Sequence, residues 1–265
     1  VNFAADVTFA DGADIITASA GTSNFRAGVN AGNSIQSGGN FNTVLGDEAG
    51  TAITTGDDNV AVGYAAGDAM TTGSYNAIVG KNSGGAITTG VENVSVGWNS
   101  LDALTEGGQN VALGASALGT DTLGSRSVAV GYQALTTQNF TTATDAHNTA
   151  VGYKAGEAVT TGANNTIIGA NTGIALTSGS NNNLIGGLAG DALTTGHSNN
   201  IMGVSCGTAL TDADYNVAIG QQALNSDTLG SQTVAIGSFA LSAQNYTTAT
   251  NSLNTAVGYA AGAAI

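Results

Sequence analysis

The hydrophobic and polar positions of this chain recur with a fixed period. An aliphatic residue followed by glycine appears thirteen times, and the twelve intervals between these glycines are ten of 17 residues and two of 21. Such a period indicates a solenoid, in which each repeat forms one coil that packs on its neighbours. The glycines are Gly46, Gly63, Gly80, Gly97, Gly114, Gly131, Gly152, Gly169, Gly186, Gly203, Gly220, Gly237 and Gly258.

The two long intervals reveal a duplicated block. They lie 106 residues apart, and the segment DTLGSRSVAVG from Asp121 is closely repeated as DTLGSQTVAIG from Asp227. We therefore expect a solenoid of thirteen coils over residues 42–265, which is about 85% of the chain. Residues 1–41 are expected to form an N-terminal capping or joining segment with one degenerate coil, around Gly28, that has one extra residue.

The columns of the repeat predict how each coil is built. Numbered from its asparagine as position 1, the coil reads N-x-A-V-G-x-x-A-G-x-A-L-T-T-G-x-x. Position 4 is always aliphatic and precedes glycine, which predicts a strand that ends in a tight turn. Position 3 faces the other side of that strand and is apolar except at Ser95, so both faces favour burial. The position 3 column is expected to form a second apolar face, through which copies of the chain associate.

Position 12 predicts a second strand in each coil, because it is usually aliphatic and glycine usually follows three residues later. In four coils position 12 is Asp or Gln instead, and an apolar residue stands two residues further on. Because side chains two residues apart share a face of a strand, we expect this apolar residue to point inward in place of position 12. The four pairs are Asp121 with Leu123, Gln138 with Phe140, Asp227 with Leu229, and Gln244 with Tyr246.

Two short strands and two glycine turns per coil favour an all-β fold, a parallel β-roll or β-solenoid in which each strand pairs with its copy one coil away. Frequent glycine and threonine argue against helices. With one strand spacing of about 4.8 Å per coil, twelve intervals give a rod of roughly 58 Å.

Position 1 predicts a structural ladder, because each asparagine amide can both donate to and accept from the amide in the next coil. Ser127 and Thr233 replace asparagine at equivalent places of the two blocks. The ladder residues are Asn42, Asn59, Asn76, Asn93, Asn110, Asn148, Asn165, Asn182, Asn199, Asn216 and Asn254.

Several segments resemble a known kind of repeat. NVAVGYAAG from Asn59, RSVAVGYQAL from Arg126, NVAIGQQAL from Asn216 and NTAVGYAAG from Asn254 are similar to the YadA-like head repeats of trimeric autotransporter adhesins and to the β-roll repeats of phage tail fibres. The resemblance implies a left-handed, homotrimeric β-roll whose apolar columns are shared between roll interiors and a threefold interface. The 17-residue coil is longer than the common head repeat, so strand and loop lengths must differ.

Composition narrows the function. The chain has 265 residues with 40 glycines and no proline, and only four Lys and Arg residues against a net charge of −14. Such a chain cannot neutralise a run of phosphates, so nucleic acid is not expected as a partner. No apolar run approaches the length of a membrane span, so membrane insertion is not expected either.

Few residues suggest chemistry, and we expect neither an enzyme nor a bound cofactor or metal. Cys206 stands at position 8, which otherwise holds small residues, and is expected to be packed. His147 and His197 are expected to be solvated turn residues. The acidic residues follow neither a Ca²⁺-binding repeat nor a recurring acid/base arrangement.

Two columns suggest binding. Aromatic residues at position 6 could stack on the sugar rings of a surface glycan, or they could pack between protomers. The threonine column at position 13 suggests an alternative class, an ice-binding solenoid, although adjacent threonines at positions 13 and 14 point to opposite faces. The aromatic residues are Tyr64, Trp98, Tyr132, Tyr153 and Tyr259.

Together these features predict a homotrimeric structural fibre, exposed on a virion as a tail or capsid fibre. It would act as a rigid spacer that supports attachment to a host glycan or receptor, in contact with other fibre or virion proteins. The alternative is the passenger head of a trimeric adhesin on a bacterial surface.

Overall fold

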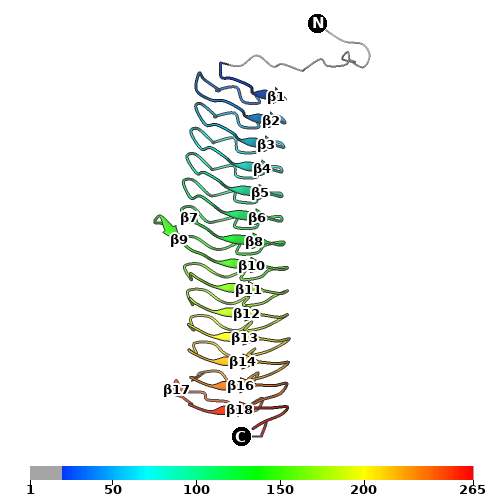
Figure 1. Cartoon of the computed structure of the whole chain (residues 1–265), viewed down its shortest axis with the longest axis vertical. Helices are drawn as coiled ribbons and strands as arrows, with labels where there is room; N and C mark the ends of the chain where they lie inside the picture. Colours follow the sequence, from blue (N-terminus) through cyan, green and yellow to red (C-terminus); the bar gives the residue numbers. More distant parts are fainter. Residues whose placement is uncertain (1–19, 265) are drawn as a thin grey trace, which may run out of the picture.

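The computed structural model describes residues 20–264, which form an elongated stack of coils with strands aligned along one side (Figure 1). The fold contains no helix within these residues. The expected capping or joining segment, residues 1–41, lies partly outside the described residues. Its degenerate coil is described and contributes the first strand, Phe25–Ala27.

One three-residue strand from each coil joins a 14-stranded parallel sheet whose strand order follows the chain. Val60 lies opposite Ala77 one coil on, and Val128 lies opposite Thr149 across the first 21-residue interval. This confirms the predicted all-β parallel solenoid with 17-residue coils. The strands are β1 (Phe25–Ala27), β2 (Thr43–Leu45), β3 (Val60–Val62), β4 (Ala77–Val79), β5 (Val94–Val96), β6 (Val111–Leu113), β8 (Val128–Val130), β10 (Thr149–Val151), β11 (Thr166–Ile168), β12 (Asn183–Ile185), β13 (Asn200–Met202), β14 (Val217–Ile219), β16 (Val234–Ile236) and β18 (Thr255–Val257).

The predicted second strand around position 12 is wrong for the ordinary coils. Ile53 and its equivalents are buried there, but the chain passes through them in turns. The amide of Thr71 and that of Gly73 both donate to the carbonyl oxygen of Thr88, at 2.9 and 3.3 Å. Because a single carbonyl accepts both bonds, the regular alternation of a ladder does not develop.

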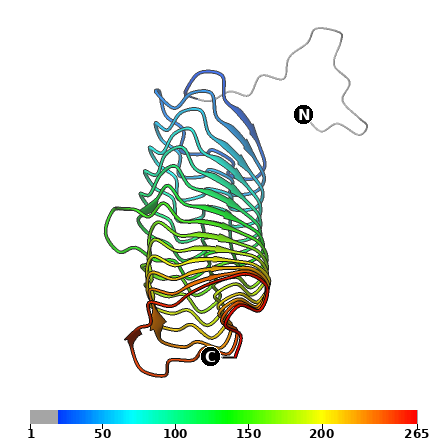
Figure 2. The ribbon, with the colours of Figure 1, turned by 60° about the horizontal axis from the view of Figure 1, so that its bottom comes forward.

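Within residues 20–264, second strands occur only in the two 21-residue coils and in the coil before each of them. β7 (Gly124–Ser125) pairs with β9 (Thr144–Asp145), and β15 (Gly230–Ser231) pairs with β17 (Thr250–Asn251). The two inserted segments project from the same side of the stack, away from the large sheet (Figures 1 and 2).

The two faces of the main strand are reversed relative to the expectation. Position 3 lies inside the coil, where Val44 and Ile167 are completely buried, whereas position 4 faces outward. Val96 at position 4 is 40% exposed and Ile168 is 37% exposed. The apolar column left open on a single chain is therefore position 4, flanked by position 2, and not position 3.

Position 3 is inside because it shares a narrow interior with positions 8, 9 and 12, and their volumes compensate. Wherever position 9 is leucine, position 3 of the same coil is only Ser or Ala, as with Leu118 and Ala112. Where position 3 is large, position 9 of the same coil is glycine: a Cβ on Gly50 would lie 2.7 Å from Cγ1 of Val44. The buried leucines have left-handed backbones, with φ of 49° at Leu118. Burial of a leucine side chain contributes about 1.5–3 kcal/mol, which offsets the cost of about 1–2 kcal/mol of its left-handed backbone.

The four exceptional coils differ from the prediction in part. Asp121 and Gln138 themselves occupy the interior, at most 1% exposed, and Leu123 is only half-buried, whereas Phe140 is buried as predicted, at 7%. The Gln138 amide donates to Asp121 Oδ2 at 2.5 Å, and the backbone N–H of Phe140 donates to Oδ1 at 3.1 Å. Since the polar groups satisfy one another, no shift of an apolar residue into their place is needed. Asp227 and Gln244 repeat this arrangement.

The glycine after each strand is required by contact between coils. Gly114 has φ of +140°, and a Cβ there would lie 2.4 Å from the carbonyl oxygen of Gly131 in the next coil. We expect Gly114→Ala to lower the free energy of unfolding by more than the roughly 1–3 kcal/mol of backbone strain alone. Urea unfolding followed by circular dichroism measures this.

The matched control is Gly187→Ala, because a Cβ on Gly187 would find no atom closer than 3.9 Å. It should change stability by less than about 0.5 kcal/mol. Equal effects of the two substitutions would contradict the role of close coil contact at Gly114.

Candidate functional site

The position 6 aromatics lie at the corner that follows each main strand, and all five are exposed. Their side chains project from the turn because the preceding glycine ends the strand. Their exposed fractions are 55% for Tyr64, 54% for Trp98, 46% for Tyr132, 51% for Tyr153 and 80% for Tyr259.

The structure brings two of these five rings into direct contact. Tyr132 and Tyr153 are stacked with ring centroids 5.6 Å apart and an interplanar angle of 13°. Lys154 Nζ lies 5.9 Å from the Tyr153 ring and 2.9 Å from a carboxylate oxygen of Glu157. Tyr259 meets the edge of Phe239 at 6.0 Å. The five aromatics are therefore separate features along the rod and not one continuous platform.

Another set of exposed aromatics was missed by the sequence analysis. Phe41, Tyr75 and Tyr215 stand at position 17, directly before the ladder asparagine, and are 57 to 62% exposed. Their backbones are left-handed, with φ of 57 to 62°. The signal in the sequence was weak because this turn column mixes aromatic, acidic, basic and amide residues.

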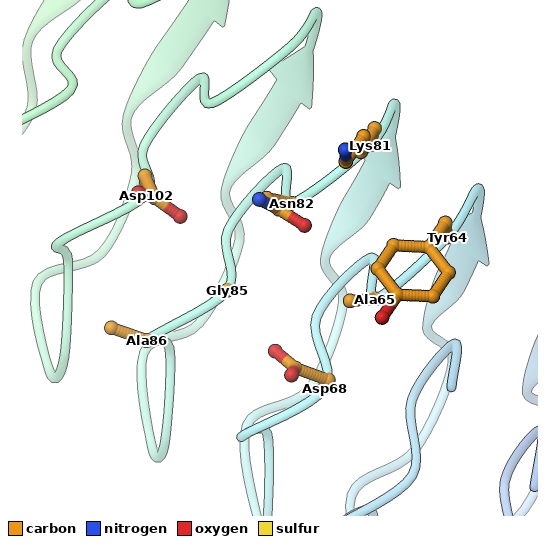
Figure 3. A pocket seen from close by; sticks show the side chains of 8 residues that line it. All are labelled: Tyr64, Ala65, Asp68, Lys81, Asn82, Gly85, Ala86 and Asp102. Carbon is orange, nitrogen blue, oxygen red and sulfur yellow. The ribbon is translucent and has the colours of Figure 1, made fainter. Parts of the chain in front are cut away.

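Tyr64 forms one wall of an open hollow of about 550 Å³ that spans three coils (Figure 3). Lys81 Nζ lies 5.8 Å from the Tyr64 ring, and Asp68 and Asp102 approach from position 10. Burial raises the pKa of both carboxyls, and the charge of Asp68 raises the pKa of Asp102 further. The remaining lining residues are Ala65, Asn82, Gly85 and Ala86.

A second hollow continues from the first along the same side of the coils. It has a volume of about 230 Å³ and shares Asp102 with its neighbour. Oδ1 of Asn99 is buried there without a hydrogen-bond partner. The other lining residues are Ser116, Gly119, Thr120 and Thr136.

The position 1 asparagines form a buried column of hydrogen bonds. Oδ1 of Asn148 accepts from both the backbone N–H and the side-chain amide of Asn165, at 2.9 and 3.2 Å. The same side-chain amide donates to the carbonyl oxygen of Gly179 at 2.9 Å, which ties the ladder to the position 15 turn. The column starts earlier than expected, since Asn24 of the degenerate coil accepts from Asn42.

Where the ladder lacks asparagine, a glutamine from the long coil bridges the gap. Gln138 donates to Ser127 Oγ at 3.1 Å and accepts from Asn148 at 2.9 Å. Gln244 links Thr233 to Asn254 in the same way in the second block. The duplicated insertion thus preserves the buried polar column.

The position 13 threonines use their hydroxyls inside the protein. Thr54 Oγ1 donates to the carbonyl oxygen of Thr71 at 3.1 Å, and Thr71 repeats this bond to Thr88. These hydrogens are therefore already donated between coils, so the geometry does not favour a flat ice-binding array.

Cys206 is completely buried among the small residues of position 8. Its thiol lies 3.2 Å from the carbonyl oxygen of Ala218, and burial raises the pKa of the thiol to about 12. At neutral pH the side chain is therefore an uncharged packing group and not a thiolate nucleophile.

The two histidines lie in exposed turns, and they belong to different parts of the rod. Nδ1 of His197 accepts from the backbone N–H of Ser180 at 3.0 Å. Within residues 20–264, no three His, Cys, Asp or Glu side chains gather in an arrangement that could hold a metal ion. Over the same range, no helix is long and apolar enough to cross a membrane.

Comparison of this chain with family models, with curated proteins and with solved structures gives no match. The fold is therefore established by the repeat and the strand pairing described above.

The ladder predicts that one internal asparagine supports two neighbouring coils. Asn165→Ala would leave the backbone N–H of Asn182 and the carbonyl oxygen of Gly179 buried without these partners, at a cost of about 1–3 kcal/mol for each group. We expect a clear fall in the urea midpoint. Thr195→Ala is the control, because the Thr195 hydroxyl also bonds the next coil, at Asp212, but in a surface turn outside the sheet; it should stay within about 0.5 kcal/mol.

The burial of Cys206 predicts that its thiol is unreactive in the folded protein. At pH 8, well below its pKa of about 12, we expect almost no reaction with a disulfide reagent in the folded protein and full reaction in urea. Rapid reaction without urea would contradict the buried position.

Proposed function

We propose that this chain is a structural fibre segment that associates with copies of itself, as a homotrimer, through the outer face of the 14-stranded sheet. That face consists of positions 2 and 4 of the fourteen strands, and none of its residues is charged. Its length is about 62 Å at one strand spacing per coil. An uncharged strip of this length with an apolar column at position 4 marks an interaction surface.

A second copy of the chain is the partner that fits this face best. The apolar side chain of position 4 recurs once in every coil. A second copy of the chain therefore presents apolar side chains at the same spacing, and the two faces can pack along their whole length. A face without charges also avoids repulsion between chains that each carry a net charge of −14. The threefold number comes from the resemblance of the repeats to trimeric β-rolls.

A rigid spacer is the role that the remaining features support. Neighbouring coils are joined by strand pairing, by the buried asparagine column and by the threonine hydroxyls. Each coil therefore supports the next, and bending would break bonds in several columns at once. The variable, exposed corners at positions 6 and 17 would then serve as attachment surfaces.

The location follows from the same resemblance. We favour a fibre on a virion, in contact with other virion proteins, that supports attachment to a host surface. The alternative is the passenger head of a bacterial surface adhesin. The genomic context distinguishes them, through neighbouring phage-structural genes on one side or a stalk and membrane anchor on the other.

Lysine substitutions test the sheet face. Val96→Lys combined with Ile168→Lys places two charges on the exposed position 4 column. We expect the native mass of the protein to fall from three copies to one, with the β-sheet circular dichroism retained, because burial of an unpaired ammonium at an interface is strongly unfavourable.

The control is Val91→Lys, because Val91 is equally exposed, at 41%, but stands on a turn away from the strands. It should leave the native mass unchanged. A wild-type protein that is monomeric over the micromolar range would overturn self-association through this face.

A further inference from the structure

The two hollows beside Tyr64 and Asp102 adjoin at Asp102, and together we call them the position 10 groove. It crosses five coils, from Tyr64 to Thr136, a length of about 19 Å at one strand spacing per coil. Its lining comes from positions 6, 7, 10 and 11, and none of these belongs to the outer sheet face. The groove is therefore a feature separate from the proposed interface between copies.

Missing side chains create the groove. Position 10 is glycine at Gly85 and Gly119, on either side of Asp102. A Cβ on Gly85 would lie 3.0 Å from Asp102 Oδ1 and 3.5 Å from Asp68 Oδ1. Any larger residue at Gly85 would thus stand between the two carboxylates that Figure 3 shows facing the hollow.

The duplicated block provides an internal comparison. The residues 106 positions later keep the backbone pattern but replace the aromatic ring, both carboxylates, the lysine and the glycine. Tyr64, Asp68, Lys81, Gly85 and Asp102 correspond to Ala170, Ile174, Gly187, Asp191 and Thr208. The fold does not need the groove residues, because the second block forms the same coils without them.

The groove lining is rich in hydrogen-bond acceptors. Asp68 and Asp102 present carboxylate oxygens in a partly desolvated setting, and Oδ1 of Asn99 is buried without a partner. A ligand that fits must bring several O–H or N–H donors. It also needs an apolar face for Tyr64, whose ring is more than half exposed at the rim.

Charge decides between classes of such ligands. Two carboxylates and Lys81 leave the first hollow with one net negative charge, and the whole chain carries −14. Acidic ligands are therefore repelled, whereas ligands with amino groups are attracted. Sugar rings combine rows of hydroxyl donors with an apolar C–H face, and amino sugars add positive charge.

We propose that the position 10 groove binds a saccharide chain that contains amino sugars, with Asp68 and Asp102 accepting from its hydroxyl and ammonium groups and Tyr64 stacking on one ring. This inference rests on the attachment part of the proposed function and gives it a ligand class and a place. It does not depend on the number of copies in the fibre.

Titration calorimetry with a glucosamine tetramer and with a glucose tetramer, at low and at physiological salt, tests the proposal. We expect the glucosamine tetramer to bind, and the glucose tetramer to bind at least tenfold more weakly. Absence of heat with both probes would overturn the proposal. Equal binding of both would overturn the role of the amino group. Calcium chloride alone should give no heat, and binding of Ca²⁺ that Asp102→Asn abolishes would identify a cation site instead.

Variants locate the binding. Asp102→Asn should weaken binding of the glucosamine tetramer at least tenfold, and Gly85→Thr, which fills the hollow with a residue found at position 10 in other coils, should abolish it. Asp191→Asn is the matched control, because Asp191 is a partly buried aspartate at the same coil position in the second block. If Asp102→Asn and Asp191→Asn weaken binding equally, the groove assignment is wrong.

Native mass is measured for every variant, which keeps this proposal distinct from self-association. Retained trimers without saccharide binding would refute the groove alone. Saccharide binding by a monomer would refute the proposed interface and leave the groove intact.

Discussion

The buried asparagines of position 1 depend on copies of themselves in the neighbouring coils. The position 1 asparagines from Asn42 to Asn216 are at most 1% exposed, so their amides must find their partners within the protein. The amide of the neighbouring asparagine, together with the position 15 carbonyl, satisfies each of them. Exact repetition of position 1 is therefore a physical requirement of the stack.

The same constraint explains where repetition is relaxed. The 21-residue coils replace asparagine with Ser127 or Thr233 and supply Gln138 or Gln244 to bridge the gap. Apolar columns tolerate more variation because volume is shared among positions. Leucine at position 9 is allowed where position 3 is small, and glycine is needed where position 3 is large. Hydrogen bonding fixes the residue type in the polar column, whereas the apolar columns require only that the side chains of one coil fill the same total volume.

Function is expected at the positions that stacking leaves free. The outer sheet face is uncharged along the rod, with an apolar column at position 4, which suits contact with identical copies. The turn positions 6, 7, 10 and 11 vary from coil to coil, and in the first block their variation produces a groove with carboxylates, an amide and an aromatic ring. A repeated face supports assembly, and a local departure from the repeat supports recognition.

The sequence alone determined the coil length, the duplicated block, the parallel stacking and the chain of asparagines, because each of these follows from the identity of residues one period apart. It did not determine which side of a three-residue strand faces inward, since positions 3 and 4 are both apolar and only the shared volume with positions 8, 9 and 12 distinguishes them. It also predicted a second strand at position 12 that the turn geometry replaces. The groove could not be predicted, because Gly85 matters only through the atoms of Asp68 and Asp102 that three-dimensional stacking places on either side of it.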